Sequence, residues 1–175
     1  MYVCNIIIRK FIYKFVKKEY MENRIFMERA IELSKDNVNN GGGPFGAVIV
    51  KDGKIIAEGV NRVTSNNDPT AHAEVNAIRA ACKALNTFKL DTCTIYTSCE
   101  PCPMCLSAIY WAGIEKIYYG NTKEDAKGIN FDDSFIYQEI EKPKAARAVK
   151  ATQLMPKEAY QAFKMWADKT DKIEY

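Results

Sequence analysis

The sequence predicts an α/β protein in which helices cover both faces of a mixed sheet. Strand-like segments alternate with helical segments along the chain, as they do when helical crossovers join parallel strands. A predicted hairpin precedes this alternation and adds an antiparallel pair to the sheet. The 175 residues are 47% hydrophobic and 27% charged, which suits a single globular domain with a short appendage and excludes a mostly disordered chain.

The first half of the chain is expected to form a helix and a hairpin. Apolar side chains recur at helical spacing over residues 21–37, and a glycine-rich run then ends the helix. Residues 46–51 (GAVIVK) read as a strand. An Asp-Gly pair, a strong two-residue turn signal, predicts that residues 54–59 return antiparallel to it. Residues 61–70 are polar and contain a proline, so we expect a loop.

The second half is expected to alternate helices and strands. Residues 72–85 are rich in alanine and predict a helix. Pro103 is well placed at the first position of another helix, because its fixed φ suits that position. The expected elements are helix 72–85, strand 92–97, helix 103–112, strand 116–119 and helices 132–140 and 157–168.

The first 20 residues differ from the rest in charge. They carry five cations and one anion, a net charge of +4, whereas residues 21–175 carry 20 cations and 21 anions, a net charge of −1. A near-neutral body lacks the basic field of a nucleic-acid-binding protein, so no nucleic-acid partner is expected. We interpret residues 1–20 as an N-terminal extension, non-native or disordered, with residues 21–175 forming the folded domain. Translation starting at Met21 would explain it; a basic membrane-surface helix and an ordinary extra element are the alternatives.

Six cysteines would suit a disulfide framework only in a secreted chain, and no signal peptide is evident. The cations of the first 20 residues follow the apolar stretch, whereas in a signal peptide they precede it. The apolar run at residues 6–8 is far shorter than the roughly 20 residues needed to cross a bilayer. We therefore expect a cytoplasmic protein with reduced thiols and no membrane partner.

Two short segments contain the residues expected to carry the chemistry, residues 69–74 (PTAHAE) and 99–105 (CEPCPMC). Cys102 and Cys105 lie three apart at a helix start, so their sulfurs face the same side and the helix dipole favours thiolates. His72 is the only histidine in the chain. One imidazole and two thiolates form a zinc set with a fourth position open to water. The sequence therefore predicts one zinc ion per subunit.

Glu74 is predicted to carry protons at this site. It lies two residues after His72, where side chains splay around the start of a helix and both can face one pocket. Bound zinc lowers the pKa of a water molecule towards ~7, and a carboxylate can pass a proton from that water to a leaving amine. The spacing H-x-E followed by P-C-x-x-C is the zinc-deaminase signature. The alternatives are a thiol redox pair and a closed structural zinc site with Cys99 as fourth ligand.

Further matching segments point to one family. They are GGPFGAVIV (42–50), NDPTAHAEVNAIR (67–79), IYTSCEPCPMC (95–105), AIYWA (108–112), FDDSFIY (131–137) and the terminal Tyr175. With them, residues 21–175 resemble the cytidine and deoxycytidylate deaminase superfamily, and within it the small zinc-dependent guanine deaminases of bacteria. The zinc motifs define only the superfamily, whereas FDDSFIY and Tyr175 point to guanine.

The resemblance implies a three-layer α/β/α sandwich with a mixed central sheet, and a homodimer that exchanges C-terminal segments by domain swapping. It implies hydrolysis of guanine, a purine base, to xanthine and ammonia. Asp133 is implied as a second proton carrier beside Glu74, although the choice between Asp132 and Asp133 rests on the resemblance alone. The residues implied to bind the base are Asn61, Phe45, Ala73, Trp111 and, from the partner subunit, Tyr175.

Simpler explanations stay open for these helper residues and for the activity. The alternative roles are a turn residue for Asn61, ordinary core for Phe45 and Trp111, a helix cap for Asp132 or Asp133, and a frayed terminus for Tyr175. A tRNA adenosine deaminase shares the zinc set, but the near-neutral body and FDDSFIY argue against it. A cytidine or deoxycytidylate deaminase is the next alternative. A structural zinc-binding dimerisation module is the non-enzymatic one, and Glu74 argues against it.

Overall fold

The computed structural model describes the backbone of residues 2–174 and the side chains of residues 20–174. The chain divides into two compact units, Met1–Asp132 and Asp133–Tyr175. The first unit contains α1 (Tyr2–Asn39), β1 (Gly46–Lys51), β2 (Lys54–Val60), α2 (Val63–Asn66), α3 (Ala73–Leu85), β3 (Thr94–Cys99), α4 (Pro103–Trp111), β4 (Lys116–Asn121) and α5 (Lys123–Lys127). The second contains α6 (Ser134–Glu141), the 3₁₀ turn η1 (Lys144–Ala146) and α7 (Pro156–Asp168).

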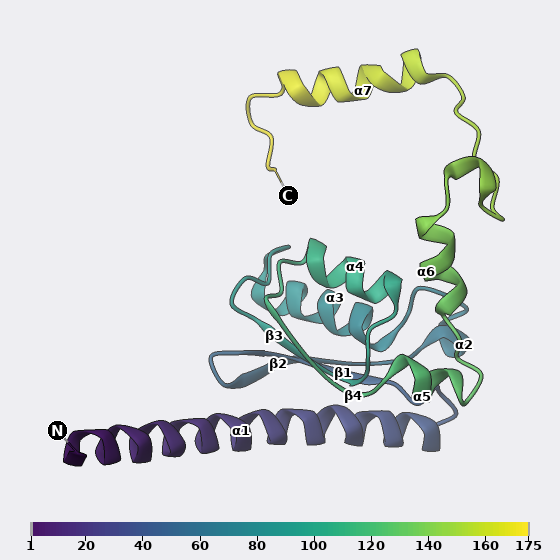
Figure 1. The fold of residues 1–175 in the computed structure, drawn as a ribbon. Coiled ribbons are helices and arrows are strands. Elements are labelled where there is room, and N and C mark those ends of the chain that lie inside the picture. The colour runs from purple at the N-terminus through teal and green to yellow at the C-terminus, as the bar shows by residue number, and fades with distance from the viewer. Residues whose placement is uncertain (1, 175) are drawn as a thin grey trace. The chain divides into compact units, whose positions relative to one another are not determined.

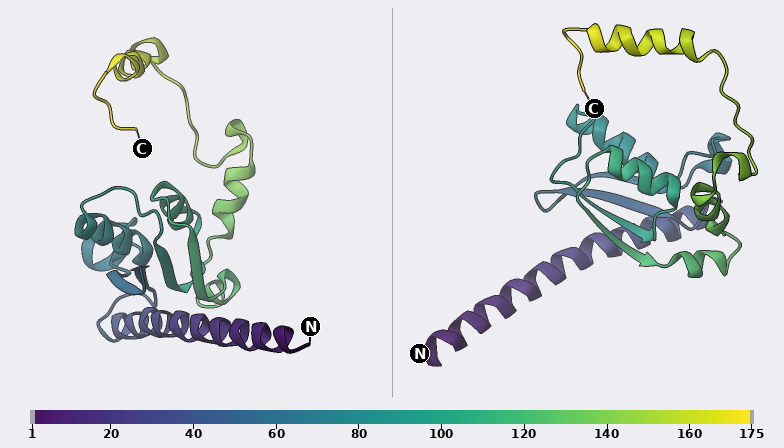
Figure 2. Two further views of the ribbon diagram at one scale, coloured as in Figure 1. Left: turned by 90° about the vertical axis from the view of Figure 1, so that its left-hand side faces the viewer. Right: turned by 45° about the horizontal axis from the view of Figure 1, so that its top comes forward.

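The first unit is built around a four-stranded mixed sheet with the order β2-β1-β3-β4. Strand β1 pairs antiparallel with β2 and with β3, while β3 and β4 are parallel and joined by α4. Helix α1 lies on one face of the sheet, and α3 and α4 lie on the other (Figures 1 and 2). The predicted α/β fold with a mixed sheet between two helical layers is therefore confirmed.

The sheet is buried on both faces because its side chains alternate. Along β1, Ala47 and Ile49 belong to the core beneath α3 and α4, and Val48 and Val50 belong to the core beneath α1. Gly59 on β2 lets α3 pack closely, since a Cβ there would lie 2.2 Å from the backbone oxygen of Ala73. The start of α3 is thus fixed against the sheet, and this start carries a predicted metal ligand.

Helix α1 is longer than the predicted helix over residues 21–37. It runs without a break from Tyr2 to Asn39, and its first half extends beyond the sheet (Figure 2). Asn23 ties it to the sheet, since its side chain accepts a hydrogen bond from the Tyr96 hydroxyl at 2.6 Å and donates one to Tyr118 at 3.2 Å. The side chains of residues 1–19 lie outside the described ones, so the interpretation of 1–20 as an extension stays a prediction. Among the described residues, no helix has the length and hydropathy that a membrane span requires.

Two short helices interrupt segments expected to be irregular. The predicted loop over residues 61–70 is wrong at α2, which forms one turn. Helix α5 follows a capping box in which the Thr122 hydroxyl accepts from the Asp125 amide and the Asp125 carboxylate accepts from the Thr122 amide. Strand β3 begins two residues later than predicted, at Thr94. These differences leave the order of the long elements as expected.

The second unit contains hydrogen bonds and an aromatic contact among its own residues. Arg147 donates hydrogen bonds to the backbone oxygens of Ile140 and Lys142, at 2.9 and 3.1 Å, and so closes the turn after α6. Helices are found over both predicted C-terminal segments. On α7, Tyr160 and Phe163 lie edge to face with ring centroids 6.1 Å apart, and large apolar side chains along this helix are exposed.

Candidate metal centre

Two helix starts on the same face of the sheet supply the predicted metal ligands. His72 is the N-cap residue of α3, and its extended backbone (φ −70°, ψ 160°) turns the chain into the helix. Cys102 is the N-cap residue of α4 and is followed by Pro103, as the sequence predicts. Cys105 lies in the first turn of α4 and is fully buried, whereas His72 and Cys102 are half-buried.

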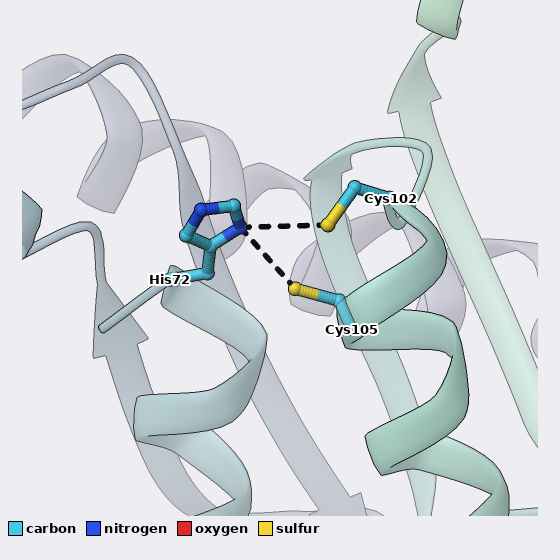
Figure 3. A group of neighbouring side chains, drawn as sticks. All are labelled: His72, Cys102 and Cys105. Carbon is cyan, nitrogen blue, oxygen red and sulfur yellow. Dashed lines mark hydrogen bonds between the residues drawn. The ribbon is translucent and has the colours of Figure 1, made fainter. Parts of the chain in front are cut away.

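The three donor atoms have the spacing that zinc requires. Nδ1 of His72 lies 3.5 Å from Sγ of Cys102 and 3.5 Å from Sγ of Cys105 (Figure 3). A tetrahedral zinc with Zn–S bonds of about 2.3 Å and a Zn–N bond of about 2.05 Å places nitrogen and sulfur about 3.6 Å apart, close to the distances found here. The residues present therefore fit a zinc ion. Within the described residues, these three form the group that can hold a metal.

Hydrogen bonding prepares one thiol as a ligand. The hydrogen bond from Cys105 and the neighbouring His72 imidazole lower the pKa of the Cys102 thiol to about 4, outweighing its burial. The contact between the two cysteines raises the pKa of Cys105, and the separate hydrogen bond between His72 and Cys102 raises the pKa of His72. These contacts favour a thiolate at Cys102, and both cysteines must be deprotonated to bind a metal.

Glu74 lies beside the ligands in the first turn of α3. Its side chain is buried, and its Oε2 accepts a hydrogen bond from Sγ of Cys105 at 3.4 Å. Its Oε1 accepts one from the Thr97 hydroxyl of β3 at 3.5 Å. Burial raises the pKa of this carboxyl group, which favours holding a proton. Sequence reasoning missed Thr97, because the alternation of side chains along a strand does not show which threonine contacts a carboxylate on a helix packed against the sheet.

Cys99 does not belong to the ligand group. It is buried, and its Sγ donates to the backbone oxygen of Thr122 at 3.6 Å. Burial raises the pKa of the Cys99 thiol to about 11, so it is protonated at neutral pH. The five cysteines with described side chains are all free thiols. This geometry argues against a closed four-ligand site with Cys99 as the fourth ligand.

Three predicted base-binding residues lie beside β1, beside β2 and at the start of α3. Asn61 follows β2, is 8% exposed, and accepts a hydrogen bond from the Val63 amide at 3.2 Å through Oδ1, so it also serves as a turn residue. Phe45 precedes β1 and meets Phe131 edge-on at 5.0 Å. Ala73 is the fully buried first residue of α3.

The remaining predicted residues belong to other parts of the chain. Trp111 ends α4 and is 72% exposed in the single chain, so it is not ordinary core there. Asp132 forms an ion pair with Lys127 at 3.1 Å. Asp133 is the N-cap residue of α6 and begins the second unit. Tyr175 lies outside the described residues.

Comparison with known families identifies the class of the chain. The family described as the cytidine and deoxycytidylate deaminase zinc-binding region matches residues 21–121, more than half of the chain. The chain belongs to this family. The deaminase match includes all three metal ligands and Glu74, and together with the donor geometry it shows a zinc site with one ion per chain.

Individual deaminases match over different lengths. The guanine deaminase of Bacillus subtilis is 54% identical over 156 residues, which are 89% of this chain and 100% of that protein. An X-ray structure of guanine deaminase from Bacillus subtilis superimposes with a TM-score of 0.84 at 55% identity, over 87% of this chain and 98% of that one. A tRNA-specific adenosine deaminase of Agrobacterium fabrum is 43% identical over 107 residues, or 61% of this chain and 69% of that protein. This deaminase therefore shares nearly its whole length with guanine deaminase.

Proposed function

We propose that this deaminase hydrolyses guanine to xanthine and ammonia. One observation carries the substrate assignment. The 156 residues aligned with a guanine deaminase outnumber the 132 residues of the first unit, so the match includes part of the C-terminal unit as well as the zinc site. The match to a tRNA-specific adenosine deaminase covers only 107 residues. The C-terminal unit carries the FDDSFIY segment from Asp133 onwards, which supports guanine as the substrate.

The zinc ligands in this proposal are His72, Cys102 and Cys105. When bound, zinc supplies Lewis-acid activation of a water molecule at neutral pH. The two sulfurs and the imidazole hold three of its four positions, and the geometry leaves Cys99 out. Protein side chains then control where the protons go.

Glu74 is proposed to move those protons. Its carboxylate takes a proton from the attacking water as the water oxygen adds to C2 of guanine. It gives this proton to the ring nitrogen, then takes the remaining proton of the new C2 hydroxyl and passes it to the exocyclic nitrogen, which leaves as ammonia, so that guanine and water become xanthine and ammonia. Burial, which raises the pKa of Glu74, helps it to hold the proton between these two steps.

The base is proposed to bind between Asn61 and Phe45, with Ala73 and Trp111 completing the wall. An amide offers both a donor and an acceptor, which suits the purine edge. An aromatic face stacks on a base with about 1–3 kcal/mol. Phe131 packs against Phe45 and supports the ring in one orientation.

Asp133 is proposed as the second proton carrier, facing the leaving amine. The choice of Asp133 over Asp132 rests on the resemblance of the FDDSFIY segment to guanine deaminases. The exposed aromatic residues of α7 support a homodimer in which C-terminal segments are exchanged and Tyr175 closes the partner's site. The free thiols support a cytoplasmic location, which cell fractionation tests.

An ammonia-release assay tests the substrate. Zinc-loaded protein is offered guanine, adenine, cytidine and tRNA under the same conditions. We expect turnover of guanine and little release from the other three. Activity on cytidine or tRNA without activity on guanine would refute the guanine assignment while leaving the zinc chemistry intact.

Mixing two inactive variants tests the exchanged segment. Glu74→Gln disables the site of its own chain, and Tyr175→Ala disables the site of its partner. If Tyr175 acts across the dimer, unfolding and refolding the two variants together restores about a quarter of wild-type activity, because half of the dimers are mixed and each has one complete site. A mixture no more active than its components would show that Tyr175 does not act across the interface.

A further inference from the structure

Asn37 is a buried asparagine near the C-terminal end of α1, and no functional role is predicted for it from the sequence. Its side chain is only 4% exposed. It continues the stripe of Ala30 and Ser34, which are also buried, so it faces the sheet. A buried amide is costly unless its polar atoms are hydrogen-bonded, so its partners show what it holds in place.

The partners of Asn37 are the two segments that carry the proposed base-binding residues. Nδ2 of Asn37 donates to the backbone oxygen of Gly43 at 2.8 Å and to the backbone oxygen of Asn61 at 2.9 Å. Gly43 lies two residues before Phe45, whose backbone oxygen accepts from the Asn61 amide at 3.2 Å. One side chain therefore joins the Phe45 segment to Asn61.

The glycines of this segment leave room for that arrangement. A Cβ on Gly42 would lie 2.3 Å from Nδ2 of Asn37, and so would collide with it. A Cβ on Gly43 would lie 3.3 Å from Cγ of Asn61 and 3.5 Å from the Phe45 ring. The asparagine side chains and the aromatic ring are thus packed closely around a backbone that has no side chains of its own.

We propose that Asn37 is a positioning residue for base recognition, which sets the placement of Asn61 relative to Phe45. The inference rests on the proposed function, since it takes Asn61 and Phe45 as the groups that contact guanine. Binding groups lose effectiveness when they move by about 0.5 Å, so a lost tether between them weakens substrate binding even where the fold persists. If the role of Asn37 were purely structural, replacing it would lower the stability of the protein and leave substrate binding unchanged.

Two variants loosen the tether in different ways. Asn37→Asp keeps the shape of the side chain but replaces the donor Nδ2 with an oxygen that faces two carbonyl oxygens. Gly42→Ala keeps Asn37 but adds a methyl group where Nδ2 lies. The matched control is Asn23→Asp on the same helix, because Asn23 also ties α1 to the sheet but contacts Tyr96 and Tyr118.

The variants are compared in zinc content, melting temperature, and KM and kcat for guanine. We expect Asn37→Asp and Gly42→Ala to keep one zinc per chain and to lose about tenfold in kcat/KM, mainly through KM. Asn23→Asp is expected to lower the melting temperature with kcat/KM within about twofold of wild type. An unchanged KM in both tether variants, or an equal loss of kcat/KM in the control, would overturn the proposal.

Amide hydrogen exchange separates this inference from the substrate assignment. We expect exchange at residues 42–46 and 61–63 to be faster in Asn37→Asp than in wild type and in Asn23→Asp. If wild-type protein fails to deaminate guanine, the proposed function is wrong, and the exchange rates still decide whether Asn37 tethers the two segments. Unchanged exchange there would refute the tether whatever the substrate.

Discussion

Replacing Glu74 with glutamine is the sharpest test of the chemistry. The two side chains have nearly the same shape, but glutamine cannot take up a proton at neutral pH. Glu74 accepts hydrogen bonds from Cys105 and Thr97, and the amide oxygen of glutamine can keep one of them. The zinc ligands themselves are unchanged, so metal binding is expected to persist.

The expected loss of activity is much larger than the expected loss of stability. General acid–base catalysis contributes about 10²- to 10⁴-fold, which equals about 2.7–5.4 kcal/mol of transition-state stabilisation at about 1.36 kcal/mol per tenfold. Losing one neutral hydrogen bond costs about 1 kcal/mol. For a chain of this size, that shifts the melting temperature by roughly 2–4 °C. A hundredfold slower Glu74→Gln enzyme is therefore still folded at assay temperature.

The assay follows ammonia release from saturating guanine, with zinc per chain measured on the same samples. Glu58→Gln on β2 is the matched control, because it makes the same chemical change at a half-exposed ion pair with Arg29. We expect the control to retain wild-type kcat. A zinc-loaded Glu74→Gln enzyme with kcat within tenfold of wild type would refute the proton-carrier role.

Three further predictions concern metal binding, pH and the chain's first residues. Cys105→Ser is expected to lose most zinc and Cys99→Ser to retain it, as measured by elemental analysis; equal losses would contradict the ligand set. Hydrogen bonds from Arg29 lower the pKa of Glu58 below its ordinary value of 4.5. The ion pair therefore stabilises the folded protein fully above pH 4.5, and this stabilisation is lost as the pH falls through the lower pKa of the folded state. Glu58→Gln should therefore cost at most about 1 kcal/mol of unfolding free energy at pH 7 and nothing at strongly acidic pH, by urea denaturation. Deleting residues 1–20 should leave guanine turnover within about twofold of wild type, whereas an inactive or precipitated truncation would contradict this.

The parts of the fold and site that depend on short-range spacing were predictable. Cys102 and Cys105 share a side of α4 because they are three residues apart, and their partner could only be His72. The hairpin of β1 and β2 follows from its two-residue turn, since such a turn allows only an antiparallel return. These features need little knowledge of the rest of the chain.

The parts that depend on distant contacts were not predictable. Whether Trp111 at the end of α4 is buried or exposed depends on contacts with residues distant in the sequence. The spacing of residues along the chain carries no such information. Helix α5 does have a local signal in the sequence, the capping box from Thr122 to Asp125. Asn37 also had a signal, because a polar residue on the buried stripe of α1 requires buried partners.

The single histidine makes this centre unusually easy to observe. His72 meets both sulfurs through Nδ1. Because the chain has one histidine, every imidazole nitrogen signal in the NMR spectrum of a tag-free sample comes from this ring. The spectrum therefore reports the tautomer and metal occupancy of the centre without residue-by-residue assignment, and a titration with zinc can be followed on one side chain.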